Sequence, residues 1–135
     1  MDLIYPVFSL VMLTFIVATA TGLSRLISVR RKDINPKYYV LMSGDTPPDY
    51  VQKLGRNYSN LLEAPVLFYV LAVLVIALRI DSALMLNLAW VYVALRLVHT
   101  IIHITYNHVI HRFITFVSSL LVLLAMWLHF MMLVG

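Results

Sequence analysis

The sequence contains no cysteine, and only 12% of its 135 residues are charged. The lack of cysteine excludes disulfides, thiolate metal sites and a cysteine nucleophile, so any thiol chemistry needs a thiol from outside the chain. Soluble domains carry about 25% charged residues. With half that charge and 62% hydrophobic residues, this composition is typical of a protein that lies in lipid.

Long basic runs are also missing. The chain has ten Lys and Arg against six Asp and Glu, but no basic run is longer than Arg30-Arg31-Lys32. A nucleic-acid partner is therefore not expected, because no soluble surface carries a basic patch. Eleven of these sixteen charged residues lie between Arg25 and Glu63. In a membrane protein, such an uneven distribution of charge sets the orientation.

Four apolar segments are long enough to cross a membrane, which takes about 20 residues of helix. The sequence predicts spanning helices over about residues 3–27, 56–79, 82–107 and 112–134. Short links join the later helices, which favours antiparallel neighbours. The long loop over residues 28–55 contains several prolines, so little regular structure is expected there. We predict an all-α membrane protein in which residues 1–135 form one four-helix bundle.

Lysine and arginine gather around the first and third connections, whereas the second connection has only Arg79. The positive-inside rule places the arginine-rich connections in the cytoplasm and both termini outside. The chain is thus expected to be a multi-pass integral membrane protein surrounded by membrane lipids.

The charges buried inside the spanning segments all fall in the half near the long loop. Arg56, Asn60 and Glu63 are spaced i, i+4 and i+7, and therefore share one face of the second helix. Arg96 and His99 begin a similar stripe on the third helix, which continues through His103. Two polar stripes at the same depth are expected to face each other.

The charges of this cluster do not balance. Four arginines, Arg25, Arg56, Arg96 and Arg112, accompany a single carboxylate, Glu63. A charge near the bilayer centre costs about 2.5–3.5 kcal/mol, so a group of them calls for a reason. Pairing of Glu63 with Arg96 is one such reason. Surplus guanidinium groups are also suited to an anion, particularly a carboxylate or phosphate.

The histidines raise the question of a metal site, because His99 and His103 lie one turn apart. No cysteine or acidic cluster offers further ligands, and the neighbouring arginines repel a cation. We expect no metal, and interpret both histidines as groups that hydrogen-bond across the bundle or line the cavity as neutral donors. His129 has no visible partner in the sequence and is expected at the outer interface.

The segment Arg56-Asn57-Tyr58-Ser59-Asn60-Leu61-Leu62-Glu63-Ala64-Pro65 resembles the second-helix signature of the MAPEG family. That name covers membrane-associated proteins in eicosanoid and glutathione metabolism. Arg96-Leu97-Val98-His99-Thr100 and Arg112 are similar to its third- and fourth-helix motifs, and Gly22-Leu23-Ser24-Arg25 to the end of its first helix. The resemblance covers the whole chain and favours a bacterial member similar to the microsomal glutathione transferases, in the inner membrane.

The resemblance implies a homotrimer that binds glutathione between protomers and acts on lipophilic electrophiles or lipid hydroperoxides. Arg112 would stabilise the thiolate. His103 stands where many members have a tyrosine, and Tyr106 is the nearest tyrosine. The residues implied to bind glutathione are Arg25, Arg56, Asn60, Glu63, Arg96, His99, His103 and Tyr106.

Two departures from the family pattern exclude one branch. Ser59 replaces a second arginine, and Phe113 replaces a serine, of the prostaglandin synthases, so prostaglandin isomerase activity is not expected. The alternative function is a non-catalytic membrane module that binds an anionic lipid or a protein partner through the same arginines. A proton-coupled carrier has less support, because four short helices without an inverted repeat leave little room for alternating access.

Overall fold

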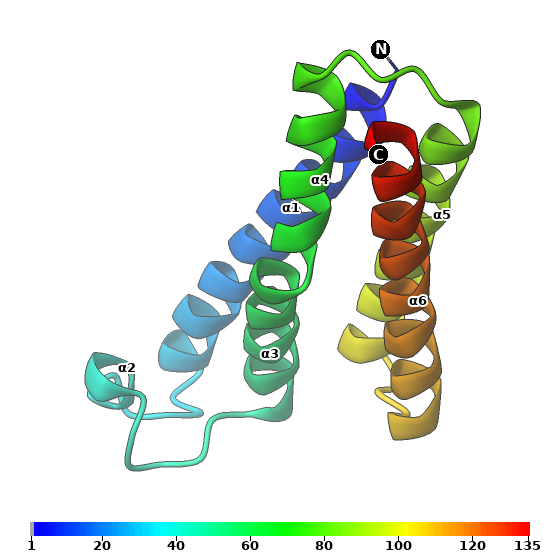
Figure 1. The fold of residues 1–135 in the computed structure, drawn as a ribbon. Coiled ribbons are helices and arrows are strands. Elements are labelled where there is room, and N and C mark those ends of the chain that lie inside the picture. Colours follow the sequence, from blue (N-terminus) through cyan, green and yellow to red (C-terminus); the bar gives the residue numbers. More distant parts are fainter. Residues whose placement is uncertain (1) are drawn as a thin grey trace.

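The computed structural model describes residues 2–135 and contains only helices and connecting segments in that range. Four crossing units are long and apolar enough to span a membrane, which confirms the predicted all-α membrane fold. Both chain ends lie at one end of the molecule, and a short helix lies at the other (Figure 1). The helices are α1 (Ile4–Arg30), α2 (Tyr38–Leu41), α3 (Asp49–Glu63), α4 (Pro65–Ala77), α5 (Ala83–Ile104) and α6 (Val109–Val134).

The first connection contains more helix than expected. α1 continues to Arg30, α2 forms within the loop, and α3 begins at Asp49 rather than near residue 56. Pro48, in an extended conformation with φ −57° and ψ 153°, starts α3, and the carboxylate of Asp49 in the first turn suits the helix dipole. Hydropathy locates only the apolar part of a helix, so it missed this polar extension.

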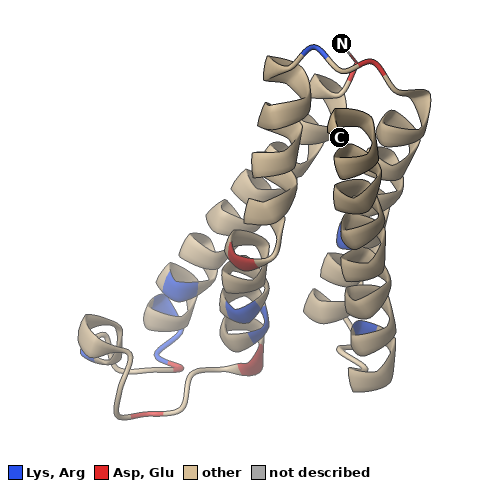
Figure 2. Cartoon of the chain, viewed as in Figure 1, with Lys and Arg blue, Asp and Glu red and all other residues tan. Residues whose placement is uncertain are grey.

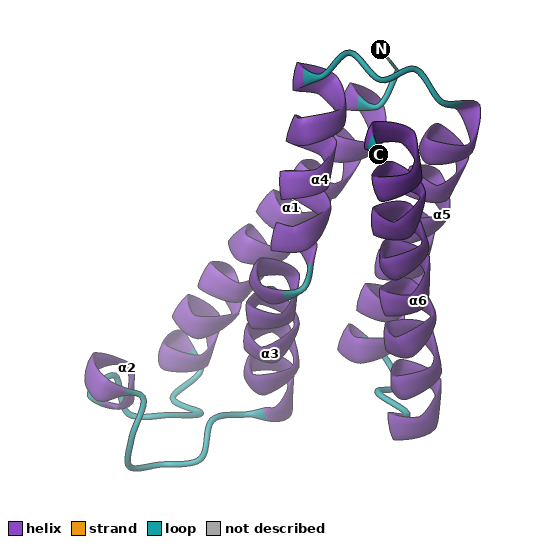
Figure 3. Ribbon diagram, viewed as in Figure 1, coloured by secondary structure: helices purple, strands orange, loops and turns teal. Residues whose placement is uncertain are grey.

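The second crossing is interrupted at Ala64, between α3 and α4 (Figure 3). Pro65 has no backbone N–H to donate, which breaks the hydrogen-bond ladder at this level. Ala64 keeps helical angles, φ −58° and ψ −40°, so Asp49–Ala77 remains one crossing of 29 residues. Glu63 therefore lies at the break, partway through the crossing.

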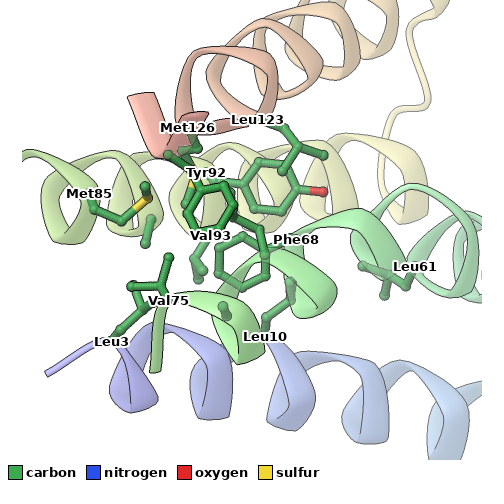
Figure 4. Packing of buried hydrophobic residues seen from close by; sticks show 14 of the residues in the cluster. Leu3, Leu10, Leu61, Phe68, Val75, Met85, Tyr92, Val93, Leu123 and Met126 are labelled. Carbon is green, nitrogen blue, oxygen red and sulfur yellow. The ribbon is translucent and has the colours of Figure 1, made fainter. Parts of the chain in front are cut away.

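The hydrophobic core lies in the half of the bundle that carries the termini. The rings of Phe68 on α4 and Tyr92 on α5 stack at the centre of this cluster, with centroids 4.8 Å apart (Figure 4). Leu10 of α1, Met85 of α5 and Met126 of α6 complete it and are fully buried. Every crossing contributes, so this cluster holds the four together.

His129 has a partner, contrary to the expectation from the sequence. Its Nε2 atom lies 2.9 Å from the hydroxyl of Ser82, which also accepts a hydrogen bond from the backbone N–H of Met85. Ser82 thus caps the start of α5 and ties it to α6. The pairing joins residues far apart in the sequence, which is why spacing gave no sign of it.

Substitution of Phe68 by alanine should lower the melting temperature of the detergent-purified protein. Detergent also solvates phenylalanine in the unfolded state, so the substitution lowers the free energy of unfolding only by the packing that is lost, about 1–3 kcal/mol. Phe8→Ala is the matched control, because Phe8 is 60% exposed on the surface of a spanning helix. Equal effects of the two substitutions would contradict the placement of this core.

Candidate functional site

The charged residues lie mainly in the half of the molecule opposite the chain ends (Figure 2). Arg79, in the connection between α4 and α5, is the basic residue at the end with the termini. Within the charged half, α3 packs against both α1 and α5. Its side chains therefore face two sides of the bundle.

A row of polar contacts joins α3 to α5. The guanidinium of Arg96 donates to the Oδ1 atom of Asn60. One turn away, Asn57 and Thr100 exchange hydrogen bonds of 3.3 and 3.4 Å. The two polar stripes do face each other, as predicted, but Arg96 contacts Asn60 rather than Glu63.

A cavity of about 520 Å³ lies in this half between α1, the first connection and α3. Arg25, Arg56, Asn60 and Glu63 all line it, so four of the predicted site residues come together here. Its volume is within the range of about 300–1,000 Å³ that is usual for small-molecule sites. Arg56 and Glu63 are exposed, so the cavity opens at the surface of the protomer.

The sequence did not reveal the rest of this lining. Tyr39 contributes its ring: its hydroxyl is 2.6 Å from that of Ser28, and the Arg25 guanidinium lies 5.9 Å from its centroid. Gln52 also lines the cavity, one turn before Arg56 on the same face of α3. Gln52 lies four residues before Arg56 and continues the polar stripe, but the sequence predicted that this helix starts near residue 56, so Gln52 was not included.

Arg112 lines a different cavity, of about 220 Å³, together with His99. Its Nη1 atom donates to Asn107 Oδ1 over 2.8 Å. Asn60 lines this cavity as well as the larger one, so α3 forms the wall between them. Within one protomer, Arg112 and Arg25 therefore approach Asn60 from separate cavities.

His103 and Tyr106 occupy different surroundings. His103 is buried and lines a third cavity, of about 180 Å³, with Arg56 and Lys53. Tyr106 is 60% exposed, and its hydroxyl lies 2.8 Å from His111 Nδ1. Tyr106 lines none of the three cavities.

Arg96 is completely buried, beside the ring of Phe116. Within residues 2–135, its Nε and Nη1 atoms have no hydrogen-bond partner, and neither does the Nδ1 atom of His99 or of His103. Buried polar groups are usually paired, so these atoms, like the Tyr92 hydroxyl in the core, keep unused hydrogen-bonding capacity. The interior of this half is rich in donors and cations and poor in acceptors, as an anion site requires.

In the described range, no group of three or more His, Cys, Asp or Glu is placed to hold a metal ion.

The fold and the site define a multi-pass integral membrane protein with an arginine-lined cavity. A model of the MAPEG family matches residues 3–132, nearly the whole chain, and the chain belongs to this family. Its members are glutathione transferases, peroxidases or leukotriene and prostaglandin synthases, and typically use glutathione. Searches of curated proteins and of solved structures gave no match.

Asn60→Leu should destabilise the protein by about 3–5 kcal/mol, because it leaves the buried guanidinium of Arg96 without its acceptor. Adding Arg96→Met should restore most of the loss, because an apolar pair of similar volume needs no hydrogen bond. Thermal unfolding in detergent measures both, with Ser59→Leu, at an exposed neighbouring position, as the control. A double variant no more stable than Asn60→Leu alone would show that the pairing does not matter.

Proposed function

We propose that this protein is a glutathione-dependent transferase or peroxidase that acts on lipophilic electrophiles or lipid hydroperoxides. The observation that carries the proposal is the cavity of about 520 Å³ lined by two arginines, an asparagine and a single glutamate. Glutathione has two carboxylates, one ammonium and amide groups, so these side chains are its complement. The family's usual use of glutathione adds support.

The charges suggest how glutathione would lie. Arg25 and Arg56 would each take a carboxylate through charge-assisted hydrogen bonds, and Glu63 would take the ammonium. Asn60 would bond the peptide amides. Arg96, His99 and His103 lie behind Asn60 or in the adjoining cavities and would complete the binding site, whereas Tyr106 would serve only if it moved inward.

The exposure of Arg56 and Glu63 supports a site shared between protomers. Both lie on a spanning helix, where a carboxylate that faced lipid would be costly. A neighbouring protomer packed over the cavity removes that cost. We therefore propose a homotrimer in which each cavity receives Arg112 from the next protomer, since Arg112 of the same chain lies in a separate cavity.

Arg112 would activate the thiol of glutathione. A free thiol has a pKa of about 8.5 and is mostly protonated at neutral pH, whereas an adjacent guanidinium favours the thiolate. The proton leaves to solvent, and the thiolate sulfur attacks an electrophilic carbon. The C–S bond forms as the leaving group departs with its bonding electrons.

With a lipid hydroperoxide, the same thiolate would attack the terminal oxygen. The O–O bond breaks, the lipid alkoxide takes a proton and leaves as the alcohol, and glutathione becomes a sulfenic acid. A second glutathione then reduces this sulfenic acid, which gives the disulfide and water. Lipophilic substrates would reach the sulfur from the bilayer.

The arginine-rich end would face the cytoplasm of a bacterial cell, with the protein in the inner membrane. The positive-inside rule predicts this orientation, and glutathione is the main redox buffer of the cytosol, so the cavity would open to the compartment that holds its ligand.

The second candidate is a non-catalytic module that holds an anionic lipid headgroup or a protein partner through the same arginines. The cavity opens at the surface of the protomer, so a lipid headgroup could enter it from the side, and this observation favours the non-catalytic module.

Glutathione added to the detergent-purified protein should show thiolate absorbance at neutral pH. Arg112→Ala should abolish this absorbance while calorimetry still detects glutathione binding, because the thiolate alone loses its counter-charge. Arg79→Ala is the control, since Arg79 lies at the opposite end. No binding by the intact protein, together with a phospholipid that co-purifies, would favour the non-catalytic module.

Mixed assemblies test the shared site. Arg56→Ala and Arg112→Ala should each be inactive alone, but their co-expression should restore part of the thiolate absorbance. Restoration follows if one protomer supplies Arg56 and its neighbour supplies Arg112, because some mixed pairs then contain both. If one protomer supplies both arginines, co-expression would restore no thiolate absorbance. That result would refute the shared site, but it would not contradict the proposal that the protein binds glutathione.

A further inference from the structure

The first connection folds back along the bundle instead of extending away from it. The hydroxyl of Tyr39 is 2.6 Å from that of Ser28, which is buried on α1. The guanidinium of Arg25, one turn deeper on α1, lies over the Tyr39 ring. In the first turn of α3, Tyr50 donates to Asp33 over 2.9 Å. These contacts fix α2 at the depth of the last turns of a membrane-spanning helix (Figure 1).

At that depth, α2 presents apolar side chains to the outside. Val40 is 76% and Leu41 is 80% exposed, the highest fractions among the large hydrophobic residues of positions 2–135. Tyr39 points the opposite way and lines the large cavity. Met42, at φ 52°, adopts the left-handed conformation that ends the helix after a single turn. The turn is thus two-sided, with the cavity on one side and an apolar tip on the other.

Four basic residues precede the apolar tip in the chain. Arg30, Arg31, Lys32 and Lys37 are all exposed. Lysines and arginines near a bilayer surface are attracted to anionic lipids, and apolar side chains beside them bury in the boundary between headgroups and acyl chains. A second protomer would need a complementary apolar or acidic surface, whereas lipid is expected beside the end of any helix that spans the membrane.

We propose that α2 is a membrane anchor: Val40 and Leu41 insert into the leaflet at the arginine-rich end, and the exposed basic residues that precede α2 hold anionic lipid headgroups. The anchor does not depend on which ligand the cavity takes. Since Tyr39 belongs to the same turn, lipid contact at α2 also holds the cavity wall and the side chain of Arg25 in place.

The absence of cysteine allows a direct test. A nitroxide attached to Leu41→Cys, in full-length protein in nanodiscs with anionic lipid, should be accessible to oxygen and protected from a water-soluble nickel chelate. Phe8→Cys, on the surface of a spanning helix, is the lipid control, and Asp45→Cys, exposed in the same connection, is the aqueous control. The label at 41 should resemble the lipid control and be several-fold less accessible to nickel than the label at 45.

Two results would overturn the anchor. A label at 41 that is as accessible to nickel as the label at 45 would place α2 in water. Protection from both oxygen and nickel would place it against protein, as in a contact between protomers. Replacing the anionic lipid by a zwitterionic one should raise nickel accessibility at 41 several-fold. No change would refute the role of the basic residues.

Discussion

The inner half of this protein depends on the burial of one guanidinium. Arg96 lies inside the bundle with no exposed surface, on a helix that crosses the membrane. Such a charge must have a hydrogen-bond acceptor, and Asn60 of α3 provides one. The contact between Asn57 and Thr100 one turn away follows the same antiparallel register. The pairing thus sets how α3 lies on α5, and with it where the other polar side chains of α3 point.

The two ends of the bundle therefore have different roles: one end packs the helices together and the other contains the polar cavities. Stacked rings and aliphatic side chains near the chain termini pack the four crossings against one another. At the other end, the polar face of α3 separates the large cavity from two smaller ones, with Asn60 and Arg56 each lining two of them. The apolar half therefore stabilises the bundle, while several buried donors in the polar half remain free to bind a ligand.

The spacing of residues predicted much of the candidate site. Arg56, Asn60 and Glu63 lie on one helical face because periodicity alone dictates it, and they do line one cavity with Arg25. Spacing could not choose the partner of Arg96, since Asn60 and Glu63 share that face, and Arg96 bonds Asn60 rather than Glu63, the partner considered from the sequence. It also missed Tyr39 and the bond between Ser82 and His129, which join separate segments.

The sequence by itself determined the four crossings, their apolar surfaces and the placement of every intramembrane charge in one half. These are local properties, because the length of an apolar run and the helical period set them. Only the tertiary structure decided that α3 begins at Asp49, that α2 folds back beside α1, and that Arg25 and Arg112 lie on different sides of α3. Those outcomes depend on which side chains of distant segments meet, and a buried charge accepts whichever partner the packed helices bring within reach.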